Sequence, residues 1–333
     1  MERIAIIGLG LIGGSLGLAI KRAGLKDVQV AGTARTRETM QKAKKLGAID
    51  IEARTAADAV RDARLVIVAS PIMTTRHIFE EIAPALMPGA VVTDVGSTKG
   101  NVARWAKELL PPHVDFVGGH PMAGKENAGI AAADADLFKG RAWVIAPSVT
   151  AAESSVQTVV GLAQLAGATP LFMDADEHDS YVAAISHLPL LLSSALFSVA
   201  FGSAAWPELA QLASSGFRDT TRLASGSPEM AHDIMLTNRE NVLHWLDRFI
   251  EELQRFRAVV AEGESKRVIE TFAKAQIERD TFMTAGPPRR ESGEALETVS
   301  LGDMLLGSKV SGYMKKQQEI IKTMEDRANG KRR

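Results

Sequence analysis

The chain has 333 residues, more than a single hydrophobic core usually supports, so its length predicts two domains. It carries 39 Lys and Arg against 40 Asp and Glu, which leaves no net field to attract nucleic acid or an anionic membrane, and we expect neither as a partner. Cysteine is absent, which excludes disulfides, thiolate catalysis and thiolate zinc sites and fits a reducing cytoplasm.

The N-terminus reads MERIAIIGLG, where charged residues lead directly into a strand-like run instead of the apolar segment of a signal peptide. We expect no export and a cytoplasmic location. Between Ser180 and Trp206 there is no Asp, Glu, Lys or Arg, and this run is long enough to span a bilayer. It contains His187, Pro189, Gly202 and six serines, which favour a helix buried among other helices over one that faces lipid.

The first part of the chain alternates between strand and helix patterns. A β-branched run from Ile4 to Ile7 meets glycines and then turns to helical spacing, which predicts strand, tight turn and helix. A last helix and strand end near Met173. This alternation predicts a Rossmann-like α/β fold with a doubly wound, mainly parallel sheet. Further strands are predicted at residues 28–34, 64–70, 90–96, 115–120 and 141–147.

Beyond residue 174 the strand patterns stop and the sequence predicts helices, interrupted by a turn-rich interval around residues 214–230. After residue 280 the chain becomes rich in Pro, Gly and charge. We therefore expect a dinucleotide-binding domain over 1–173, an all-helical substrate and dimerisation domain over 174–280, and a flexible linker with a C-terminal helical tail over 281–333.

Three glycines between the first predicted strand and helix form the pattern G-x-G-x-x-G, at Gly8, Gly10 and Gly13. The first allows a tight turn, the second admits a pyrophosphate close to the backbone, and the third allows close packing of helix on strand. The helix N-terminus, which includes Leu11 and Ile12, would supply N–H donors to the anion. Alone the three glycines could form a structural turn, but their position predicts a dinucleotide site.

No carboxylate follows the second predicted strand, where an NAD-specific site usually has one; the sequence there is Thr33, Ala34, Arg35, Thr36 and Arg37. Hydroxyl and guanidinium donors favour a 2′-phosphate, so we expect NADP as the preferred cofactor, with NAD possible. The alternative is that the two arginines are ordinary solvated residues at a helix start.

Other polar groups follow predicted strands at the same edge of the sheet. Ser70 and Pro71 follow one strand and are predicted to line the cofactor crevice. Ser97 follows another, and it is either a site residue or the N-cap of the next helix.

His120 lies in the segment GGHPMAGKE, at the end of a further predicted strand. Pro121 favours an extended backbone before it, and Gly118 and Gly119 would leave room for cofactor and substrate. A neutral imidazole can accept the proton of an alcohol whose carbon loses a hydride. The alternative is a structural hydrogen-bonding histidine.

Five segments together carry a family resemblance: GLGLIGGSLG, DVGSTKG, GGHPMAGKE, SHLP and GFRDTTRLAS, in this order. In these motifs the chain resembles the prephenate and arogenate dehydrogenases of tyrosine biosynthesis, over about residues 1–280. The resemblance implies an NAD(P)-binding N-terminal domain, a helical C-terminal domain that forms a homodimer, and an active site between them. It also implies oxidative decarboxylation of prephenate or arogenate, which gives 4-hydroxyphenylpyruvate or tyrosine, without a metal ion.

The resemblance assigns roles to individual residues. His120 takes the place of the catalytic base and Ser97 that of the serine that orients it. Arg222 takes the place of the arginine that binds the substrate's side-chain carboxylate, which suits a bidentate guanidinium. Acidic residues that order this arginine and gate the site correspond to Glu126 and Asp219, which could otherwise form a surface charge network, and a histidine near the nicotinamide corresponds to His187.

Two positions depart from the family pattern. Leu190 stands where a second histidine often occurs, and Lys125 stands where a small hydroxyl residue is common. Both fall in the implied substrate pocket, so the choice between prephenate and arogenate stays open. Two other functions also stay open: an NADP-dependent oxidoreductase of β-hydroxyacids or imines, and a non-catalytic NADP-sensing protein.

Overall fold

The computed structural model describes residues 2–125 and 127–286. Contacts between residues divide this part of the chain into two compact units. The first unit contains residues 2–179 together with Ser225–Thr237. Among the described residues, the second contains Ser180–Ala224 and 238–286.

The first unit is built on one sheet of eight strands. They are β1 (Glu2–Ile7), β2 (Val28–Thr33), β3 (Ile51–Glu52), β4 (Ala63–Val68), β5 (Val91–Asp94), β6 (Asp115–Pro121), β7 (Ala142–Pro147) and β8 (Thr169–Phe172). Their order is β3-β2-β1-β4-β5-β6-β7-β8, and all neighbours are parallel except β6 and β7. This confirms the predicted α/β class with a mainly parallel, Rossmann-like sheet; only the two-residue β3, which is too short to carry a pattern, was not predicted.

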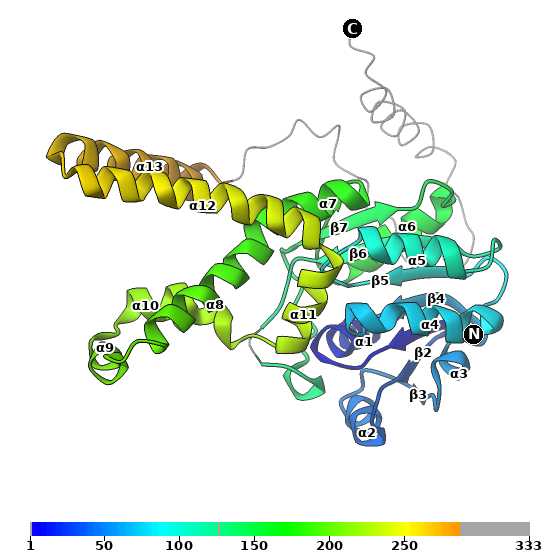
Figure 1. Cartoon of the computed structure of the whole chain (residues 1–333). Helices are drawn as coiled ribbons and strands as arrows, with labels where there is room; N and C mark the ends of the chain where they lie inside the picture. The colour runs from blue at the N-terminus through cyan, green and yellow to red at the C-terminus, as the bar shows by residue number, and fades with distance from the viewer. Residues whose placement is uncertain (1, 126, 287–333) are drawn as a thin grey trace, which may run out of the picture. The chain divides into compact units, whose positions relative to one another are not determined.

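The helices between these strands cover both faces of the sheet (Figure 1). Ile4 of β1 shares one core cluster with Leu16 and Leu162, so the helices that carry these leucines cover one face. On the other face Phe79 contacts Phe116 of β6 edge to face, with 5.8 Å between ring centroids. Burial on both faces explains why the strands read as continuous apolar runs. The helices are α1 (Leu11–Arg22), α2 (Arg37–Lys45), α3 (Ala56–Val60), α4 (Thr75–Ile82), α5 (Gly100–Leu109) and α6 (Glu153–Leu165), with short 3-10 turns η1 (Ile72–Thr74), η2 (Ala83–Ala85) and η3 (Ile130–Ala132).

One helix from far along the sequence, α11 (Pro228–Thr237), also belongs to the first unit. The Asp233 carboxylate accepts a hydrogen bond of 3.0 Å from the backbone N–H of Met73 in η1. The hydroxyls of Thr237 and Thr98 are 2.8 Å apart. These buried polar contacts hold α11 beside the carboxyl ends of β4 and β5.

The second unit is entirely helical in its described part, as predicted. A helix that begins in the first unit, α7 (Ala175–Val182), leads into a single π-helical turn, η4 (Ala183–His187). The remaining elements are α8 (Leu188–Phe201), α9 (Trp206–Leu212), α10 (Ser215–Thr221), η5 (Arg222–Ser225), α12 (Arg239–Glu262) and α13 (Ser265–Ala285).

The apolar helix in this unit differs from its prediction. The run Ala175–Phe201 is long and apolar enough to cross a membrane by length and composition, which is weak evidence for a span because core helices pass the same test. The sequence predicted that it would be buried among other helices. Instead Val199 is 77% exposed and Phe201 57% exposed, because neighbouring helices of the described chain pack on only part of its surface.

The unit boundaries also differ from the predicted domain limits. The sequence placed the first boundary at residue 173, whereas the first compact unit continues to Asp179, whose side chain binds the backbone of α5. Helix α13 continues to Ala285, past the predicted limit of 280. The rest of the predicted linker and tail, residues 287–333, lies outside the described residues.

Candidate active site

The turn between β1 and α1 has the geometry of a dinucleotide-binding loop. Gly8 has φ of +99°, and a Cβ there would lie 2.4 Å from the carbonyl oxygen of Ala69. A Cβ on Gly13 would lie 1.9 Å from the carbonyl oxygen of Gly8, so only glycine permits this approach of helix to strand. A Cβ on Gly10 would meet no atom of the described residues within 4 Å, apart from its own chain neighbours and the nearby helix backbone.

The start of α1 is suited to an anion. Its first turn, which includes Leu11 and Ile12, contains no acidic residue, and no side chain caps it. The backbone N–H groups there and the space beside Gly10 fit a pyrophosphate. The residues present therefore fit a dinucleotide cofactor.

At the end of β2 the structure places the residues predicted to select the cofactor. Thr33 is buried, and its carbonyl oxygen accepts a hydrogen bond of 2.9 Å from the N–H of Gly8. Arg35 and Arg37 are exposed, and Thr36 caps α2 through the N–H of Thr39 at 3.2 Å. Two guanidinium groups thus border the end of β2.

The nearest carboxylate in α2 is already engaged. Glu38 forms an ion pair of 2.7 Å with Lys42 on the solvent side of the helix. The hydrogen bond and charge of Lys42 lower the pKa of this carboxyl. Glu38 is therefore held as an anion by its own helix.

Ser70 and Pro71 follow β4 beside the glycine loop, since the backbone nitrogen of Ser70 lies 3.0 Å from the position of a Cβ on Gly8. The Ser70 hydroxyl is buried and has no hydrogen-bond partner among the described residues. Pro71 directly precedes η1. The geometry fits the predicted lining of the crevice.

A buried ion pair links Asp94, at the end of β5, to Lys99, the residue before α5. The Asp94 side chain is 2% exposed and that of Lys99 1% exposed, and Lys99 Nζ contacts Asp94 Oδ2 directly. The Asp94 carboxylate also accepts hydrogen bonds from the N–H groups of Gly96 at 2.9 Å and Gly119 at 3.3 Å. Asp94 therefore fixes the backbone immediately before His120.

The paired glycines before His120 serve a different purpose from the one predicted. A Cβ on Gly119 would lie 2.7 Å from the carbonyl oxygen of Asp94 and 2.9 Å from Nε1 of Trp143. A Cβ on Gly118 would lie 3.1 Å from a carbonyl oxygen of β7 and 3.2 Å from Lys99 Cδ. The space above these glycines is filled by the protein itself, not left for cofactor and substrate.

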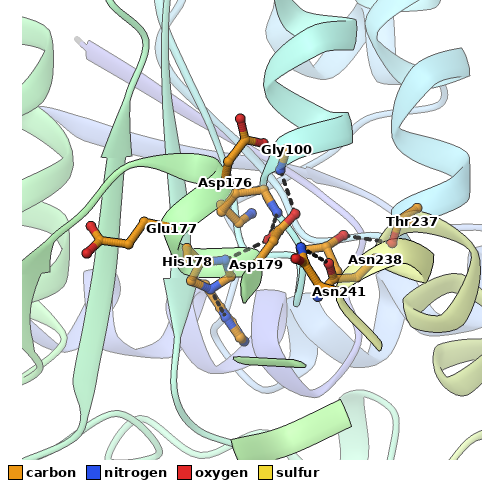
Figure 2. A network of polar contacts seen from close by, with 12 residues as sticks. Gly100, Asp176, Glu177, His178, Asp179, Thr237, Asn238 and Asn241 are labelled. Atoms are coloured by element: carbon orange, nitrogen blue, oxygen red, sulfur yellow. Dashed lines mark hydrogen bonds and ion pairs between the residues drawn. The ribbon is translucent and has the colours of Figure 1, made fainter. Parts of the chain in front are cut away.

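His120 lies near the end of β6 and contacts another histidine. Its Nδ1 is 2.9 Å from Nε2 of His178, and the two rings meet edge to face. Nδ1 of His178 is in turn 2.8 Å from Oδ1 of Asp179 (Figure 2). Neither His178 nor Asp179 was predicted as a site residue; the adjacent pair in the segment DADEHD was the available signal.

Asp179 also caps α5. Its carboxylate accepts the N–H of Lys99 at 2.7 Å and the N–H of Gly100 at 2.9 Å. Ser97, which the sequence offered either as this cap or as a site residue, lies in the bend between β5 and α5 and makes no hydrogen bond among the described residues. The cap is thus supplied from a distant part of the chain.

In the loop after β6, Lys125 is half-exposed and forms an ion pair of 2.8 Å with Asp134. This hydrogen bond lowers the pKa of the Asp134 carboxyl. The backbone N–H of Asp134 donates to the hydroxyl of Ser15 in α1, at 2.9 Å. The loop is therefore tied to the first helix. Glu126 lies outside the described residues.

In the second unit, His187 ends the π-helical turn and is 1% exposed. Its Nδ1 is 3.1 Å from Nδ2 of Asn238, whose Oδ1 accepts a hydrogen bond of 2.8 Å from Asn241. π-Helical turns occur frequently at functional sites. A buried, hydrogen-bonded histidine in this turn agrees with a role beyond packing.

The other predicted residues of the second unit are more accessible. Arg222 begins η5 and is exposed, as is Asp219 one turn earlier in α10. Leu190 is half-buried in the first turn of α8.

Comparison with known proteins identifies the family. Residues 16–170 match the nucleotide-binding domain of prephenate dehydrogenase, and residues 174–274 match its dimerization domain. Prephenate dehydrogenase of Bacillus subtilis is 35% identical over 294 residues, which cover 88% of this chain and 78% of the relative. The chain belongs to the prephenate dehydrogenase family.

Two further relatives extend this result. Cyclohexadienyl dehydrogenase of Zymomonas mobilis is 32% identical over 285 residues, which cover 85% of this chain and 97% of the relative. The crystal structure of Aquifex aeolicus prephenate dehydrogenase with hydroxyphenyl propionate and NAD+ superposes with a TM-score of 0.79 at 28% identity, covering 85% of this chain and 98% of that one.

The predicted family and reaction are therefore confirmed. The enzyme catalyses oxidative decarboxylation of prephenate or arogenate with hydride transfer to a nicotinamide cofactor. This reaction requires one group that takes a proton and others that hold charged substrate and cofactor in place. The first unit supplies the cofactor loop and a buried network behind His120.

Proposed function

We propose that this enzyme prefers NADP to NAD and that His120 takes the proton from the 4-hydroxyl group of a cyclohexadienyl substrate. The observation that carries the proposal is the placement of His120 near the end of β6, with one ring nitrogen held by His178. An imidazole in a fixed orientation can accept a proton as a carbon–hydrogen bond breaks.

The chain's own contribution to the reaction is alignment and proton transfer. The nicotinamide, when bound, accepts the hydride. His120 would take the hydroxyl proton, loss of the ring carboxylate as CO2 would leave an aromatic phenolate, and return of the proton from His120 would give the phenol. Ser97, in the bend before α5, is proposed as a second polar group that orients His120. Gly8, Gly10, Gly13 and the start of α1 hold the cofactor's pyrophosphate.

Five residues are proposed to bind the substrate or to shape its pocket. Arg222 would hold the side-chain carboxylate through two charge-assisted hydrogen bonds. Asp219 and Glu126 would order this arginine. His187 would lie near the nicotinamide and substrate, and Lys125 would add a positive charge to the pocket.

The preference for NADP rests on the end of β2. Arg35 and Arg37 are exposed there, residues 33–37 contain no carboxylate, and Glu38 is engaged by Lys42. Each charge-assisted hydrogen bond to a 2′-phosphate contributes about 1.5 to 3 kcal/mol.

Replacing both arginines by alanine tests this preference. Arg35→Ala with Arg37→Ala should lower kcat/KM for NADP by roughly 10- to 100-fold, because the phosphate loses its donors, and should leave kcat/KM for NAD within about threefold. Lys45→Ala, at the other end of α2, is the matched control for loss of positive charge. Equal losses with both cofactors would contradict the proposed phosphate site.

The enzyme is also proposed to be a cytoplasmic homodimer. Residues 174–274 match a dimerization domain, and the apolar side chains of Leu196, Val199 and Phe201 on α8 are exposed in the single chain. Covering them with a second copy removes apolar area from water without a membrane. Light scattering on the purified chain should give twice the mass of 35.7 kDa.

A four-way assay tests the proposed function as a whole. NAD and NADP are each combined with prephenate and with arogenate, and absorbance of the reduced nicotinamide is followed. The fastest rate is expected with NADP. Turnover of a β-hydroxyacid or an imine in place of both cyclohexadienes, or tight NADP binding without any turnover, would overturn the assignment.

A further inference from the structure

We propose that Asp179 and His178 form a hydrogen-bonded relay that sets the tautomer of His120, so that His120 carries its proton on Nδ1 and takes the substrate's proton at Nε2. This inference rests on the proposed role of His120 as the base. It makes His178 and Asp179 positioning residues for the reaction.

The first step concerns the carboxylate of Asp179. It accepts the N–H groups of Lys99 at 2.7 Å and Gly100 at 2.9 Å, and it lies at the N-terminus of α5, where the helix dipole favours a negative charge. An ionised carboxylate can only accept hydrogen bonds. Its contact of 2.8 Å with Nδ1 of His178 therefore requires a proton on that nitrogen.

The second step follows from the imidazole ring. A neutral His178 with its proton on Nδ1 has a lone pair on Nε2. Nε2 lies 2.9 Å from Nδ1 of His120, and two lone pairs cannot face each other at this distance. Nδ1–H of His120 must donate, which makes Nε2 of His120 the nitrogen that accepts the substrate's proton.

The relay is built to keep its shape. His178 is 0% exposed and Asp179 is 4% exposed, and the two backbone bonds from α5 prevent the carboxylate from turning. When Nε2 of His120 gains a proton, the ring becomes positive while the Asp179 charge lies behind the intervening imidazole. The incoming proton stays on His120 until it is released, and no proton has to pass along the relay.

Other charged groups near the relay have their own partners. Asp176 and Arg104 lie beside Gly100, are mostly exposed, and approach each other at 3.9 Å. The ammonium group of Lys99 contacts Asp94. The Asp179 carboxylate is thus the charge in direct hydrogen-bond contact with His178.

The tautomer can be measured directly in the full-length wild-type protein. Nitrogen-15 NMR of histidine-labelled enzyme, well above the pH at which imidazoles titrate, distinguishes a protonated from an unprotonated ring nitrogen. The spectrum of His120→Asn assigns the His120 signals by their loss. We expect His120 with its proton on Nδ1, and a His120 protonated on Nε2 would overturn the relay.

A pair of variants tests the effect of the relay on catalysis. His178→Phe keeps a ring of similar size but has no acceptor, whereas the side-chain oxygen of His178→Gln can accept from His120 Nδ1–H. We expect His178→Phe to lower kcat by about 100-fold or more, with KM changed by less than about threefold, and His178→Gln to restore most of the rate. The acid limb of the kcat/KM profile should also move to lower pH in His178→Phe, because the protonated His120 loses its acceptor and the support of the Asp179 charge.

The outcomes separate the relay from the proposed function. Equal losses in the Phe and Gln variants with an unmoved pH profile, or a wild-type rate in His178→Phe, would overturn the relay while leaving the reaction established. If neither cyclohexadiene is oxidised, the proposed function fails, yet the tautomer of His120 is still read from the NMR spectrum. Should His178→Phe not fold, as judged by thermal unfolding, that spectrum decides alone.

Discussion

His120 and His187 lie in different units, and each is held from behind by a short chain of hydrogen bonds. The hydrogen bonds behind His120 end in a charged group: Nδ1 of His120 contacts His178, and His178 contacts the Asp179 carboxylate. A carboxylate stabilises a ring that becomes positive. This arrangement suits a histidine that gains a proton during the reaction.

The hydrogen bonds behind His187 end in neutral side-chain amides, those of Asn238 and Asn241. Asn241 donates to Oδ1 of Asn238, so the amide nitrogen of Asn238 faces Nδ1 of His187 at 3.1 Å and donates to it. Neutral His187 then carries its proton on Nε2. His120 is partly buried and His187 is buried, and their surroundings suit opposite tasks: accepting a proton at His120 and donating a hydrogen bond from His187.

The largest expected effect comes from removing the proton acceptor. His120→Asn should lower kcat by roughly 10² to 10⁴, since the amide cannot take the hydroxyl proton, and should change the KM for the cofactor little. The same replacement at His187 is the matched control and should cost less. Steady-state kinetics with both substrates measure the difference, and an unchanged kcat in His120→Asn would refute the assignment of the base.

The next effect separates proton transfer from binding of the substrate's side-chain carboxylate. Arg222→Gln should raise the KM for the cyclohexadiene by roughly 10- to 100-fold, because the side-chain carboxylate loses charge-assisted hydrogen bonds, with a smaller change in kcat. Arg218→Gln, on the preceding helix α10, is the control. A loss confined to kcat would place Arg222 in the chemical step instead.

A smaller effect is expected when the hydrogen-bonded residues behind His187 are given a carboxylate, as those behind His120 have. Asn238→Asp puts an acceptor behind Nδ1 of His187, so the ring should titrate at a higher pH and kcat should fall by about tenfold as the Nε2–H tautomer is lost. Asn238→Leu removes the donor without adding charge. Proton NMR of the His187 ring through a pH series distinguishes the two variants. Identical titrations would contradict the proposed influence of the residue at position 238 on His187.

The smallest expected effect concerns the stability contribution of Glu153, a carboxyl that lacks hydrogen-bond donors of the kind that Asp179 has. One oxygen of Glu153 is buried with no partner among the described residues, and burial raises the pKa of this carboxyl. A raised pKa in the folded state means that its ionisation costs stability once the pH exceeds the unfolded value. Glu153→Gln should therefore raise Tm by about 1–2 °C at pH 7 and leave it unchanged near pH 3. An equal rise at both values would argue against ionisation as the cause.

Much of the fold was predictable because its signals are local. The β-branched runs of β1 and β4 mark strands buried on both faces, and Gly8 and Gly13 mark a turn that no other residue could form. The return of α11 to the first unit was not predictable, since its contacts to Met73 and Thr98 join residues far apart in the chain.

The candidate site divides in the same way. His120 was proposed as a site residue from the glycines and proline around it and from the family motif, and it stays a prediction. His178 was not predicted, because the only local signal was its neighbour Asp179, and its partner His120 lies 58 positions away. Ser97 was one of two open interpretations for the cap on α5, whereas the structure uses Asp179, which only the folded chain brings there.

The pair formed by Asp94 and Lys99 has a consequence for how the enzyme behaves in different solutions. Both side chains are sealed from water, so dissolved ions that weaken charge pairs on a protein's exterior do not reach them. The strand end that carries His120 is thus anchored by an attraction that ionic strength leaves intact. If His120 is the base and Arg222 binds the substrate, as proposed, added salt should weaken binding of the anionic substrate without displacing His120.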